Sequence, residues 1–557
     1  MLAPLGALLL ALAWLIPNHY TPWLAAWGDA SALAGCVVLA LWAGTRAAHG
    51  LRVSRLLAIA AGVASAAIAW QLATGRIVFV GDALMAALYL GAWFLALAVG
   101  HLAAGERNDR ALQVIAIAWL FAAIASVGLA LVQWTGAIGL GIYIADMAPN
   151  ARPFANLGQP NHLSTLCFIG VCCLGWLHQQ ARLRTLAFAS GAGFLLLGMA
   201  MSQSRTAWLQ IGLLVVWAFA QRSRVGLRLS RKQALMLGAA FGVLALGWAP
   251  LADSLLLSRG REAADVSSVD ARAAHWRMMI DAISREPWWG YGWQQVSAAQ
   301  QRVALDHPWV GEQIDSSHNL VLDLMLWNGI PIGATIVGLL TVWFVTRAVQ
   351  CREGRTAWFL ALVGGVFVHA MLEYPLQYAY FLVPVGLAMG VVDSASPQAR
   401  GLPVPRVAPL CAAGLMALML TLVGAEYFKA EEDDRTVRLE SARIGTDRIV
   451  TPAPKLMLLT QLGAYLEFAR IEPAPGMSAS RLEGMREVAE RYGYEVLMFR
   501  YAMAAGLNNQ PEVAALTLAR ICRIHTRRQC AATRTLWTAA ARDQFPQLSA
   551  VALPPLP

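Results

Sequence analysis

Long apolar stretches separated by short polar loops make up most of the chain. The hydrocarbon core of a bilayer is roughly 30 Å thick, so a helix of about 20 mostly apolar residues crosses it, and somewhat fewer suffice where flanking residues reach the interface. On that basis the pattern predicts about thirteen transmembrane helices, near residues 2–16, 27–43, 56–74, 83–103, 111–134, 163–177, 186–201, 207–220, 234–250, 320–345, 357–371, 376–392 and 407–424.

Two polar regions interrupt this pattern and divide the chain into four parts. Helices one to nine occupy residues 1–250, a long polar loop residues 251–319, helices ten to thirteen residues 320–425, and a separate domain residues 426–557. In that last domain apolar residues recur at helical spacing on both sides of a break at Gly506 to Pro511. The pattern favours paired helices. One pair resembles a tetratricopeptide hairpin, but a single pair does not make a repeat array. The predicted fold class is an all-α polytopic membrane protein with a helical C-terminal domain.

Composition and charge support this class. Of the 557 residues, 58% are apolar and only 14% are charged, whereas charged residues make up roughly a quarter of soluble domains. The formal net charge of +10 does not indicate nucleic-acid binding, because the excess arginine is spread over short loops. Cytoplasmic loops of membrane proteins collect such residues.

The loop charges predict the orientation of the helices. With a cytoplasmic N-terminus, the short outer loops carry only Arg76, Arg152 and Arg205, and the inner loops carry Arg46, Arg52, Arg55, Arg107, Arg110, Arg182, Arg184, Arg222, Arg224, Arg228, Arg231, Lys232, Arg347, Arg352, Arg355, Arg400 and Arg406. This orientation places the 251–319 loop and the tail outside the cytoplasm. Six cysteines lie in or beside apolar segments and suggest no metal site; Cys522 and Cys530 have a spacing that a disulfide can close, in an oxidising compartment.

The 251–319 loop concentrates cations and imidazoles suited to an anionic substrate near a membrane. It contains Arg259, Arg261, Arg272, Arg277, Arg285, His275, His307 and His318. Helical phase puts Arg272 and His275 on one face and Arg277 and Asp281 on an adjoining one. Arginine pairs bidentately with phosphate oxygens; the alternative is a helix lying on the membrane surface, anchored by Trp288, Trp289 and Trp293.

Four shorter motifs carry further candidates on the same outer face. The first is NLGQPNHLSTL, whose Gln159, Asn161 and His162 present amide and imidazole groups where the sixth helix enters the membrane. They suit a polar head group; the alternative is that Asn161 caps the helix and His162 is an ordinary interfacial residue.

The second motif is MSQSRTAW. A charge such as that of Arg205 within hydrocarbon costs about 3 kcal/mol on insertion scales and needs a partner or a purpose. Ser202, Gln203 and Ser204 are expected to form a polar pocket around it. The alternative is that Arg205 extends to the membrane surface.

The third motif, SSHNLVLDLMLWNGI, places His318 at the start of the tenth helix. A neutral imidazole can accept a proton from an attacking hydroxyl or position it by a hydrogen bond. A structural histidine at a helix start is the alternative. The fourth motif, HAMLEYPLQYAYF, supplies Glu373, Tyr374 and Tyr378, and its tyrosines also suit an interfacial anchor.

The order of these motifs resembles the bacterial PglL-type O-oligosaccharyltransferases, which are protein glycosylation ligases or pilin glycosylases within the Wzy/WaaL superfamily of O-antigen ligases and polymerases. NLGQPNHLSTL looks like the signature of the protein-glycosylating branch. SQSRTAW and DARAAHWRMMIDAI with its following P-W-W-G-Y-G look like the superfamily core, and SSHNLVLDLMLWNGI with HAMLEYPL looks like its catalytic end.

The resemblance implies a metal-independent, inverting glycosyl transfer without a cofactor, at the periplasmic face of the bacterial inner membrane. The donor would be an oligosaccharide on undecaprenyl pyrophosphate, and the acceptor a Ser or Thr hydroxyl of an exported protein such as a pilin. By the resemblance, Arg205 and Arg272 hold the pyrophosphate, with Arg277 as substitute; His318 orients or deprotonates the hydroxyl; Tyr374 lines the site; and Gln159, Asn161 and His162 shape the donor or acceptor pocket.

Three rival functions share parts of this pattern. An O-antigen ligase acting on lipid A core and an O-antigen polymerase share the Arg and His framework but not the GQPNH signature together with a large outer C-terminal domain. A lipid-linked glycan transporter would be expected to show internal repeats or broken helices near the bilayer midplane. No such repeat is present in the sequence.

Overall fold

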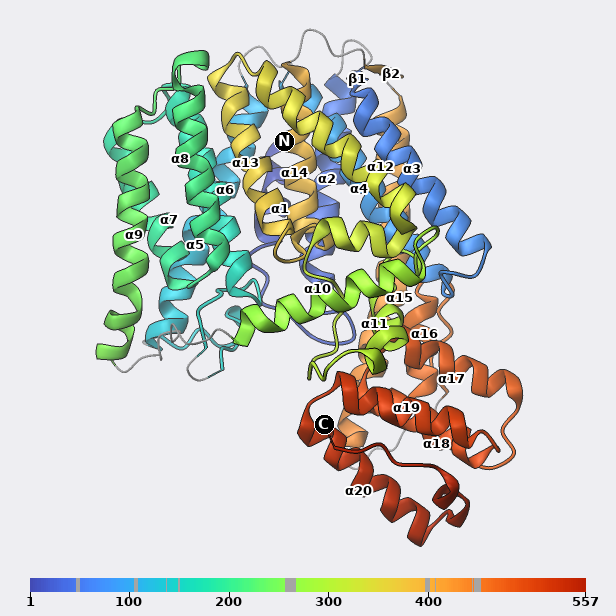
Figure 1. Cartoon of the computed structure of the whole chain (residues 1–557). Helices are drawn as coiled ribbons and strands as arrows, with labels where there is room; N and C mark the ends of the chain where they lie inside the picture. The colour runs from blue at the N-terminus through green and yellow to red at the C-terminus, as the bar shows by residue number, and fades with distance from the viewer. Residues whose placement is uncertain are drawn as a thin grey trace. The chain divides into compact units, whose positions relative to one another are not determined.

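The computed structural model describes residues 1–46, 51–104, 109–136, 138–148, 151–255, 267–395, 401–405, 407–442, 444 and 452–556. The chain is built almost entirely of helices (Figure 1). In these residues the strands are limited to β1 (Leu51–Val53) and β2 (Leu402–Val404), which pair antiparallel with Leu51 opposite Val404. The predicted all-α class is confirmed.

Each predicted transmembrane segment falls on one helix of the structure. These helices are α1 (Leu2–Leu12), α2 (Ala26–Arg46), α3 (Arg55–Ala73), α4 (Val80–Ala104), α5 (Arg110–Thr135), α6 (Pro160–Gln179), α7 (Thr185–Met201), α8 (Arg205–Val225), α9 (Arg231–Ser254), α12 (Leu320–Gln350), α13 (Gly354–Ala370), α14 (Ala379–Ser394) and α15 (Ala408–Ser441).

Eight helices in the described part of the chain are long and apolar enough to cross a membrane: α2, α3, α4, α5, α6, α9, α12 and α15. Helices α1, α7, α13 and α14 are apolar but shorter, at 10–17 residues, and α8 belongs to neither group. The protein is therefore a multi-pass membrane protein. The number of thirteen crossings stays a prediction.

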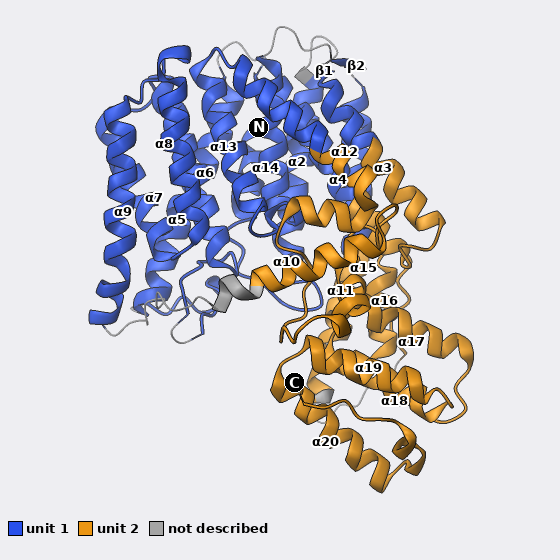
Figure 2. Ribbon diagram, in the orientation of Figure 1, with its two compact units in different colours: residues 1–62, 88–263, 338–424 blue, residues 63–87, 264–337, 425–557 orange. Residues whose placement is uncertain are grey.

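The chain forms two compact units (Figure 2). Unit 1 comprises residues 1–62, 88–263 and 338–424, and unit 2 comprises residues 63–87, 264–337 and 425–557. Unit 2 thus combines most of the described outer loop with the C-terminal region. The predicted division into four consecutive segments stays a prediction.

Helix α6 is the most enclosed helix of unit 1, and every residue from Asn161 to His178 is buried. Helices α5, α7, α8 and α13 all pack against it. Glycines allow these close approaches, since a Cβ built at Gly175 would lie 2.4 Å from the ring of Trp358. The first turn of this central helix carries the GQPNH motif.

A buried carboxylate ties three segments of unit 1 together at Asp393, near the end of α14. Its Oδ1 accepts hydrogen bonds from Nε of Arg347 and from Nε1 of Trp343, each at 2.8 Å. The backbone N–H of Ser54 donates to its Oδ2 at 3.3 Å. Arg347 is therefore part of a buried ion pair.

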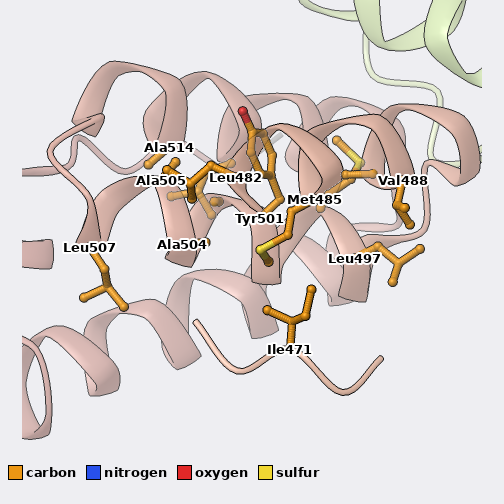
Figure 3. Close-up of a cluster of buried hydrophobic side chains, with 14 of the residues drawn as sticks. Ile471, Leu482, Met485, Val488, Leu497, Tyr501, Ala504, Ala505, Leu507 and Ala514 are labelled. Carbon is orange, nitrogen blue, oxygen red and sulfur yellow. The ribbon is translucent and has the colours of Figure 1, made fainter. Parts of the chain in front are cut away.

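Unit 2 contains the helices of the outer loop and of the C-terminal region. These are α10 (Ser267–Arg285), α11 (Val296–Val303), α16 (Thr460–Phe468), α17 (Ala479–Tyr492), α18 (Glu495–Leu507), α19 (Pro511–Ile524) and α20 (Arg527–Asp543). Helices α17 to α20 pack in sequence order around an apolar core that includes Leu482, Met485, Leu497 and Tyr501 (Figure 3). A disulfide joins Cys522 of α19 to Cys530 of α20.

The outer loop packs closely on the C-terminal helices within unit 2. The amide of Gln301 on α11 donates to the carbonyls of Ala489 and Glu490, which lie near the end of α17. Nε1 of Trp309 donates to the carbonyl of His525 at 2.8 Å. The buried Asp82 at the start of α4 accepts two hydrogen bonds from Arg491 of α17. The loop and the C-terminal helices therefore form one packed body.

The P-W-W-G-Y-G segment packs against a break in α12. Gly329 has φ 75° there, outside helical geometry, and the backbone N–H groups of Tyr291 and Gly292 donate to the carbonyls of Leu326 and Trp327. A Cβ at Gly290 would lie 2.5 Å from the Leu326 carbonyl oxygen. Glycine is needed because the two backbones touch.

Candidate functional site

The GQPNH motif and the HAMLEYPL motif meet on one buried carboxylate in unit 1. Nδ2 of Asn161 donates to Oε1 of Glu373 at 3.0 Å, and Nε2 of Gln159 lies 3.4 Å from Oε2. Glu373 is only 4% exposed. The capping interpretation of Asn161 is wrong, because the N-cap of α6 is Gln159 and Asn161 follows Pro160 inside the helix.

His162 lies inside an aromatic cluster, not at the protein surface. Its ring centroid is 4.7 Å from that of Tyr378 and 5.2 Å from that of Phe381, and its Nδ1 is 3.5 Å from the hydroxyl of Tyr380. With 2% of its surface exposed, it is not an ordinary interfacial residue. The half-buried Tyr374 extends this cluster by stacking on Tyr378, with 5.9 Å between the ring centroids.

Arg205 is exposed at the first position of α8. In the preceding turn Ser202 and Ser204 are buried, and the Ser202 hydroxyl donates to the carbonyl of Met199. The polar pocket around Arg205 stays a prediction. Nη1 of Arg152 lies 3.2 Å from the carbonyl oxygen of Ser202 and 3.4 Å from that of Gln203. Arg152 therefore braces the turn that leads into Arg205.

In unit 2, α10 presents its predicted residues to different surroundings. Arg272 is half-buried, His275 is buried, and Arg277 is exposed, with its Nε donating to the carbonyl of Ala273 one turn earlier. Burial lowers the pKa of His275, and the charge of the nearby His318 acts in the same direction. Nε1 of Trp276 donates to the carbonyl of Ser317 at 3.0 Å, which ties α10 to the segment that carries His318.

His318 lies two residues before α12 in a left-handed backbone conformation, with φ 56°. The side-chain oxygen of Asn319 caps α12 by accepting from the backbone N–H groups of Val321 and Leu322. Asp323, in the first turn, binds the residues before His318: its carboxylate accepts from the Ser316 hydroxyl and from the Ser317 backbone N–H, each at 2.7 Å. The predicted place of His318 at the helix start is confirmed.

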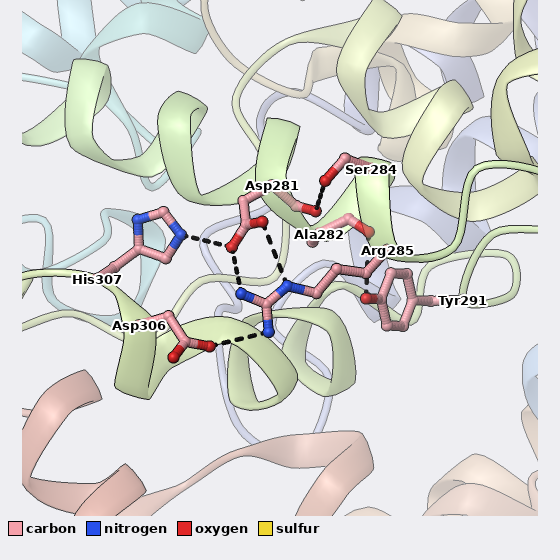
Figure 4. A network of polar contacts seen from close by, with 7 residues as sticks. All are labelled: Asp281, Ala282, Ser284, Arg285, Tyr291, Asp306 and His307. Atoms are coloured by element: carbon pink, nitrogen blue, oxygen red, sulfur yellow. Dashed lines mark hydrogen bonds and ion pairs between the residues drawn. The ribbon is translucent and has the colours of Figure 1, made fainter.

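Two members of the loop's set of cations and imidazoles, Arg285 and His307, brace the loop (Figure 4). Arg285 binds the carboxylate of Asp281 through Nε and Nη2 and that of Asp306 through Nη1, and Nε2 of His307 lies 2.8 Å from Oδ2 of Asp281. The pKa of Asp281 is lowered, chiefly because Arg285 donates hydrogen bonds to its carboxylate. The network ties α10 to the turn after α11. Arg259 and Arg261 lie outside the described residues.

The tryptophans of the loop have different environments. Trp288 and Trp289 are 68% and 48% exposed. Trp293 instead packs on Trp327, with 5.1 Å between the ring centroids. Trp288 and Trp289 are therefore the more accessible of the three tryptophans that were predicted to anchor the loop to a membrane surface.

The candidate residues divide between the units. Gln159, Asn161, His162, Arg205 and Tyr374 belong to unit 1; Arg272, Arg277 and His318 belong to unit 2. The described residues contain no group of three or more His, Cys, Asp or Glu side chains that could hold a metal ion. Metal independence stays a prediction.

Sequence reasoning did not assign roles to Arg152, Glu373 or Asp323. An acidic residue beside or inside an apolar helix is a readable signal, because it needs a partner there. That signal was available for Glu373 and Asp323. The residues that Glu373 and Arg152 contact, however, lie far from them in the sequence.

Parts of the chain match three families of known proteins. The family described as "O-Antigen ligase" matches residues 186–337, "Protein glycosylation ligase" matches residues 153–178, and "Virulence factor membrane-bound polymerase, C-terminal" matches residues 357–539. The second of these matches contains the whole GQPNH motif.

Two curated relatives come from Acinetobacter baylyi (strain ATCC 33305 / BD413 / ADP1). The chain is 28% identical to a "General O-oligosaccharyltransferase" over 542 residues, which cover 94% of this chain and 92% of that protein. It is 30% identical to a "ComP-specific O-oligosaccharyltransferase" over 331 residues, 58% of this chain and 59% of that protein.

The chain is thus a membrane glycosyltransferase, and over residues 186–337 it is similar to the O-antigen ligase family. Residues 153–178 and both curated relatives make it similar to the protein glycosylation ligases, the PglL-type O-oligosaccharyltransferases.

Proposed function

We propose that the chain transfers an oligosaccharide en bloc from undecaprenyl pyrophosphate to a Ser or Thr hydroxyl of an exported protein, such as a pilin. The observation that carries the proposal is the similarity to a general O-oligosaccharyltransferase over 94% of the chain. The meeting of Asn161 with Glu373 supports it, because two motifs of the resemblance pack together.

In this reaction the acceptor oxygen forms a bond to the anomeric carbon, and the bond from that carbon to the diphosphate oxygen breaks. The diphosphate leaves with the bonding electron pair, so fixed cations that neutralise its charge lower the barrier. The resemblance gives this role to Arg205 and Arg272, with Arg277 as substitute. The acceptor proton would pass to the imidazole of His318, or His318 would orient the hydroxyl. Tyr374, Gln159, Asn161 and His162 would shape the surroundings of the donor or acceptor.

We place the reaction at the periplasmic face of the inner membrane. The arginine distribution of the loops supports this orientation. The disulfide between Cys522 and Cys530 also supports it, since disulfides persist in oxidising compartments such as the periplasm.

The test is transfer by the purified full-length protein in vitro, with a defined undecaprenyl-pyrophosphate glycan, EDTA and two competing acceptors, a pilin and lipid A core. Glycan on pilin Ser or Thr in the presence of EDTA is the expected result. Glycan only on lipid A core would show an O-antigen ligase, and transfer to neither would contradict the proposal.

A polymerase is the second candidate, favoured by the match of residues 357–539 to a family described as a membrane-bound polymerase. A polymerase would join repeat units to one another. The same assay without any protein or lipid A acceptor separates the two, because only a polymerase would then lengthen the lipid-linked glycan.

A further inference from the structure

The buried side chain of Asp323 holds the segment before α12. Its Oδ2 accepts from the Ser316 hydroxyl and its Oδ1 from the Ser317 backbone N–H, each at 2.7 Å. Asp323, Ser316 and Ser317 are each at most 2% exposed. Both carboxylate oxygens thus bind the two residues that precede His318.

The same contacts extend to His318 itself. Its backbone N–H donates to the Ser316 hydroxyl oxygen at 3.0 Å, and that hydroxyl donates in turn to Asp323. The φ of 56° at His318 is unfavourable for a residue with a Cβ and persists only where the surroundings impose it. The chain Asp323, Ser316, His318 supplies such a restraint.

A second element fixes the segment from another side. Nε1 of Trp276 on α10 donates to the carbonyl of Ser317, the residue between Ser316 and His318. The Ser317 hydroxyl donates to the carbonyl of Asn319 at 3.0 Å. The backbone on both sides of His318 is therefore bound, while its imidazole stays half-buried.

We propose that Asp323 is a positioning residue for His318, and that it acts by holding the Ser316–Ser317 backbone so that the imidazole faces the reacting hydroxyl. The inference rests on the proposed glycosyl transfer with His318 as proton acceptor. A displacement of about 1 Å in a reacting group can lower a rate roughly 100-fold. The gain in rate from holding His318 in place can therefore offset the cost of burying a carboxylate in the first turn of a membrane helix.

The geometry requires a carboxylate in particular. The two donors reach different oxygens of Asp323, and an asparagine offers one acceptor oxygen and turns an NH2 group toward the other donor. Asp323→Asn therefore keeps the size of the side chain and loses one of the two contacts.

The test compares Asp323→Asn in two backgrounds of the full-length protein, wild type and His318→Gly with added imidazole. Glycine accepts the left-handed conformation without strain, and free imidazole replaces the base without needing the restraint. We expect Asp323→Asn to lower kcat roughly 10- to 100-fold in the wild type with the KM for the lipid-linked donor unchanged. In the imidazole-restored His318→Gly background the same substitution should have little effect on the rate.

Ser316→Ala is the second variant, because it removes the hydroxyl between Asp323 and His318 without leaving the carboxylate uncontacted by Ser317. If Asp323→Asn fails to accumulate, Ser316→Ala tests the proposal in its place. It should lower kcat in the wild type and have little effect in the imidazole-restored His318→Gly background. Asp82→Asn is the matched control: Asp82 is another buried carboxylate of unit 2, but it binds Arg491 and Gln295. It should lower thermal stability and leave kcat per folded molecule unchanged.

An equal loss of kcat in both backgrounds would show a general structural role and overturn the proposal. So would unchanged kcat in Asp323→Asn and Ser316→Ala, or a His318→Gly enzyme that imidazole fails to restore although the wild type is active. A wild-type protein that transfers no glycan would instead refute the proposed function, and this inference with it.

Discussion

Asn161 on α6 and Glu373 in the turn after α13 form a buried hydrogen bond of 3.0 Å between residues 212 positions apart. Removing the donor by Asn161→Ala takes a hydrogen bond from a buried carboxylate, which costs about 1 to 3 kcal/mol. We expect lower thermal stability and lower transfer activity. Because both residues act through the same contact, Asn161→Ala combined with Glu373→Ala should be less harmful than the sum of the single changes. Additive losses in the double-mutant cycle would contradict this coupling.

His318→Ala and Arg205→Ala should each abolish glycan transfer while leaving membrane insertion and abundance unchanged. Both side chains are at least partly accessible, so little packing is lost. Glycosylation of a co-expressed acceptor, compared with the amount of enzyme in the membrane, measures the effect. Full activity of His318→Ala would show that the catalytic role is wrong even though the family is right.

Arg347 belongs to a predicted cytoplasmic loop, so neutralising it should do little to catalysis, but its buried ion pair with Asp393 indicates a role in stability. The side chains of Arg347 and Asp393 are 11% and 4% exposed, and Nε of Arg347 lies 2.8 Å from Oδ1 of Asp393. Breaking a buried ion pair by removing one partner costs about 3 to 5 kcal/mol. Arg347→Gln should therefore lower the melting temperature of the purified protein markedly. Arg182→Gln, at an exposed position, is the control that should melt like the wild type.

The fold should lose stability as the pH falls below about 6.5 because of His275. Its pKa is lowered, chiefly by burial, with Glu312 opposing the shift. The unfolded state therefore binds the proton more readily than the folded state. The contribution to stability is complete above the unfolded pKa of 6.5 and is lost as the pH falls from there toward the lowered folded pKa. Its slope is at most about 1.4 kcal/mol per pH unit.

Thermal unfolding of the wild type and of His275→Gln between pH 7.5 and pH 5 measures this effect. The variant should lose less stability on acidification than the wild type. An equal loss in both proteins would assign the pH dependence to other groups.

Reduction of the disulfide between Cys522 and Cys530 should destabilise the C-terminal helices. The disulfide closes a short loop and lowers the conformational entropy of the unfolded chain, which stabilises the folded state by about 2 to 3 kcal/mol. Limited proteolysis of wild type and of Cys522→Ser with Cys530→Ser, with and without a thiol reductant, tests this. The wild type should become protease-sensitive on reduction, whereas cleavage of the double variant should not depend on the reductant.

The sequence was sufficient to predict the helices, because the length of an apolar segment can be read locally and a bilayer requires a certain length. It was also sufficient to place His318 at a helix start and Asn161 and Tyr374 in motifs of the family. It could not predict that Glu373 joins the Asn161 motif, since nothing local to residue 161 specifies a partner near residue 373.

The same limit applies to the cations of the outer loop. The pairing of Arg285 with Asp281, four residues earlier on α10, can be read from helical spacing. The further contacts of Arg285 with Asp306 and of Asp281 with His307 depend on how α10 packs. These tertiary contacts give Arg285 and His307 a structural role that the local sequence does not reveal.

The contacts of Gln301, Trp309 and Arg491 restrict how enzymes of this kind can be recombined. Gln301 and Trp309 precede α12, yet they bind carbonyls of the C-terminal helices, and Arg491 of those helices binds Asp82 of α4. A chimera that exchanged only residues 426–557 would leave these groups facing foreign partners. Grafting the tail from a relative should therefore require residues 296–314 and the first turn of α4 from the same donor.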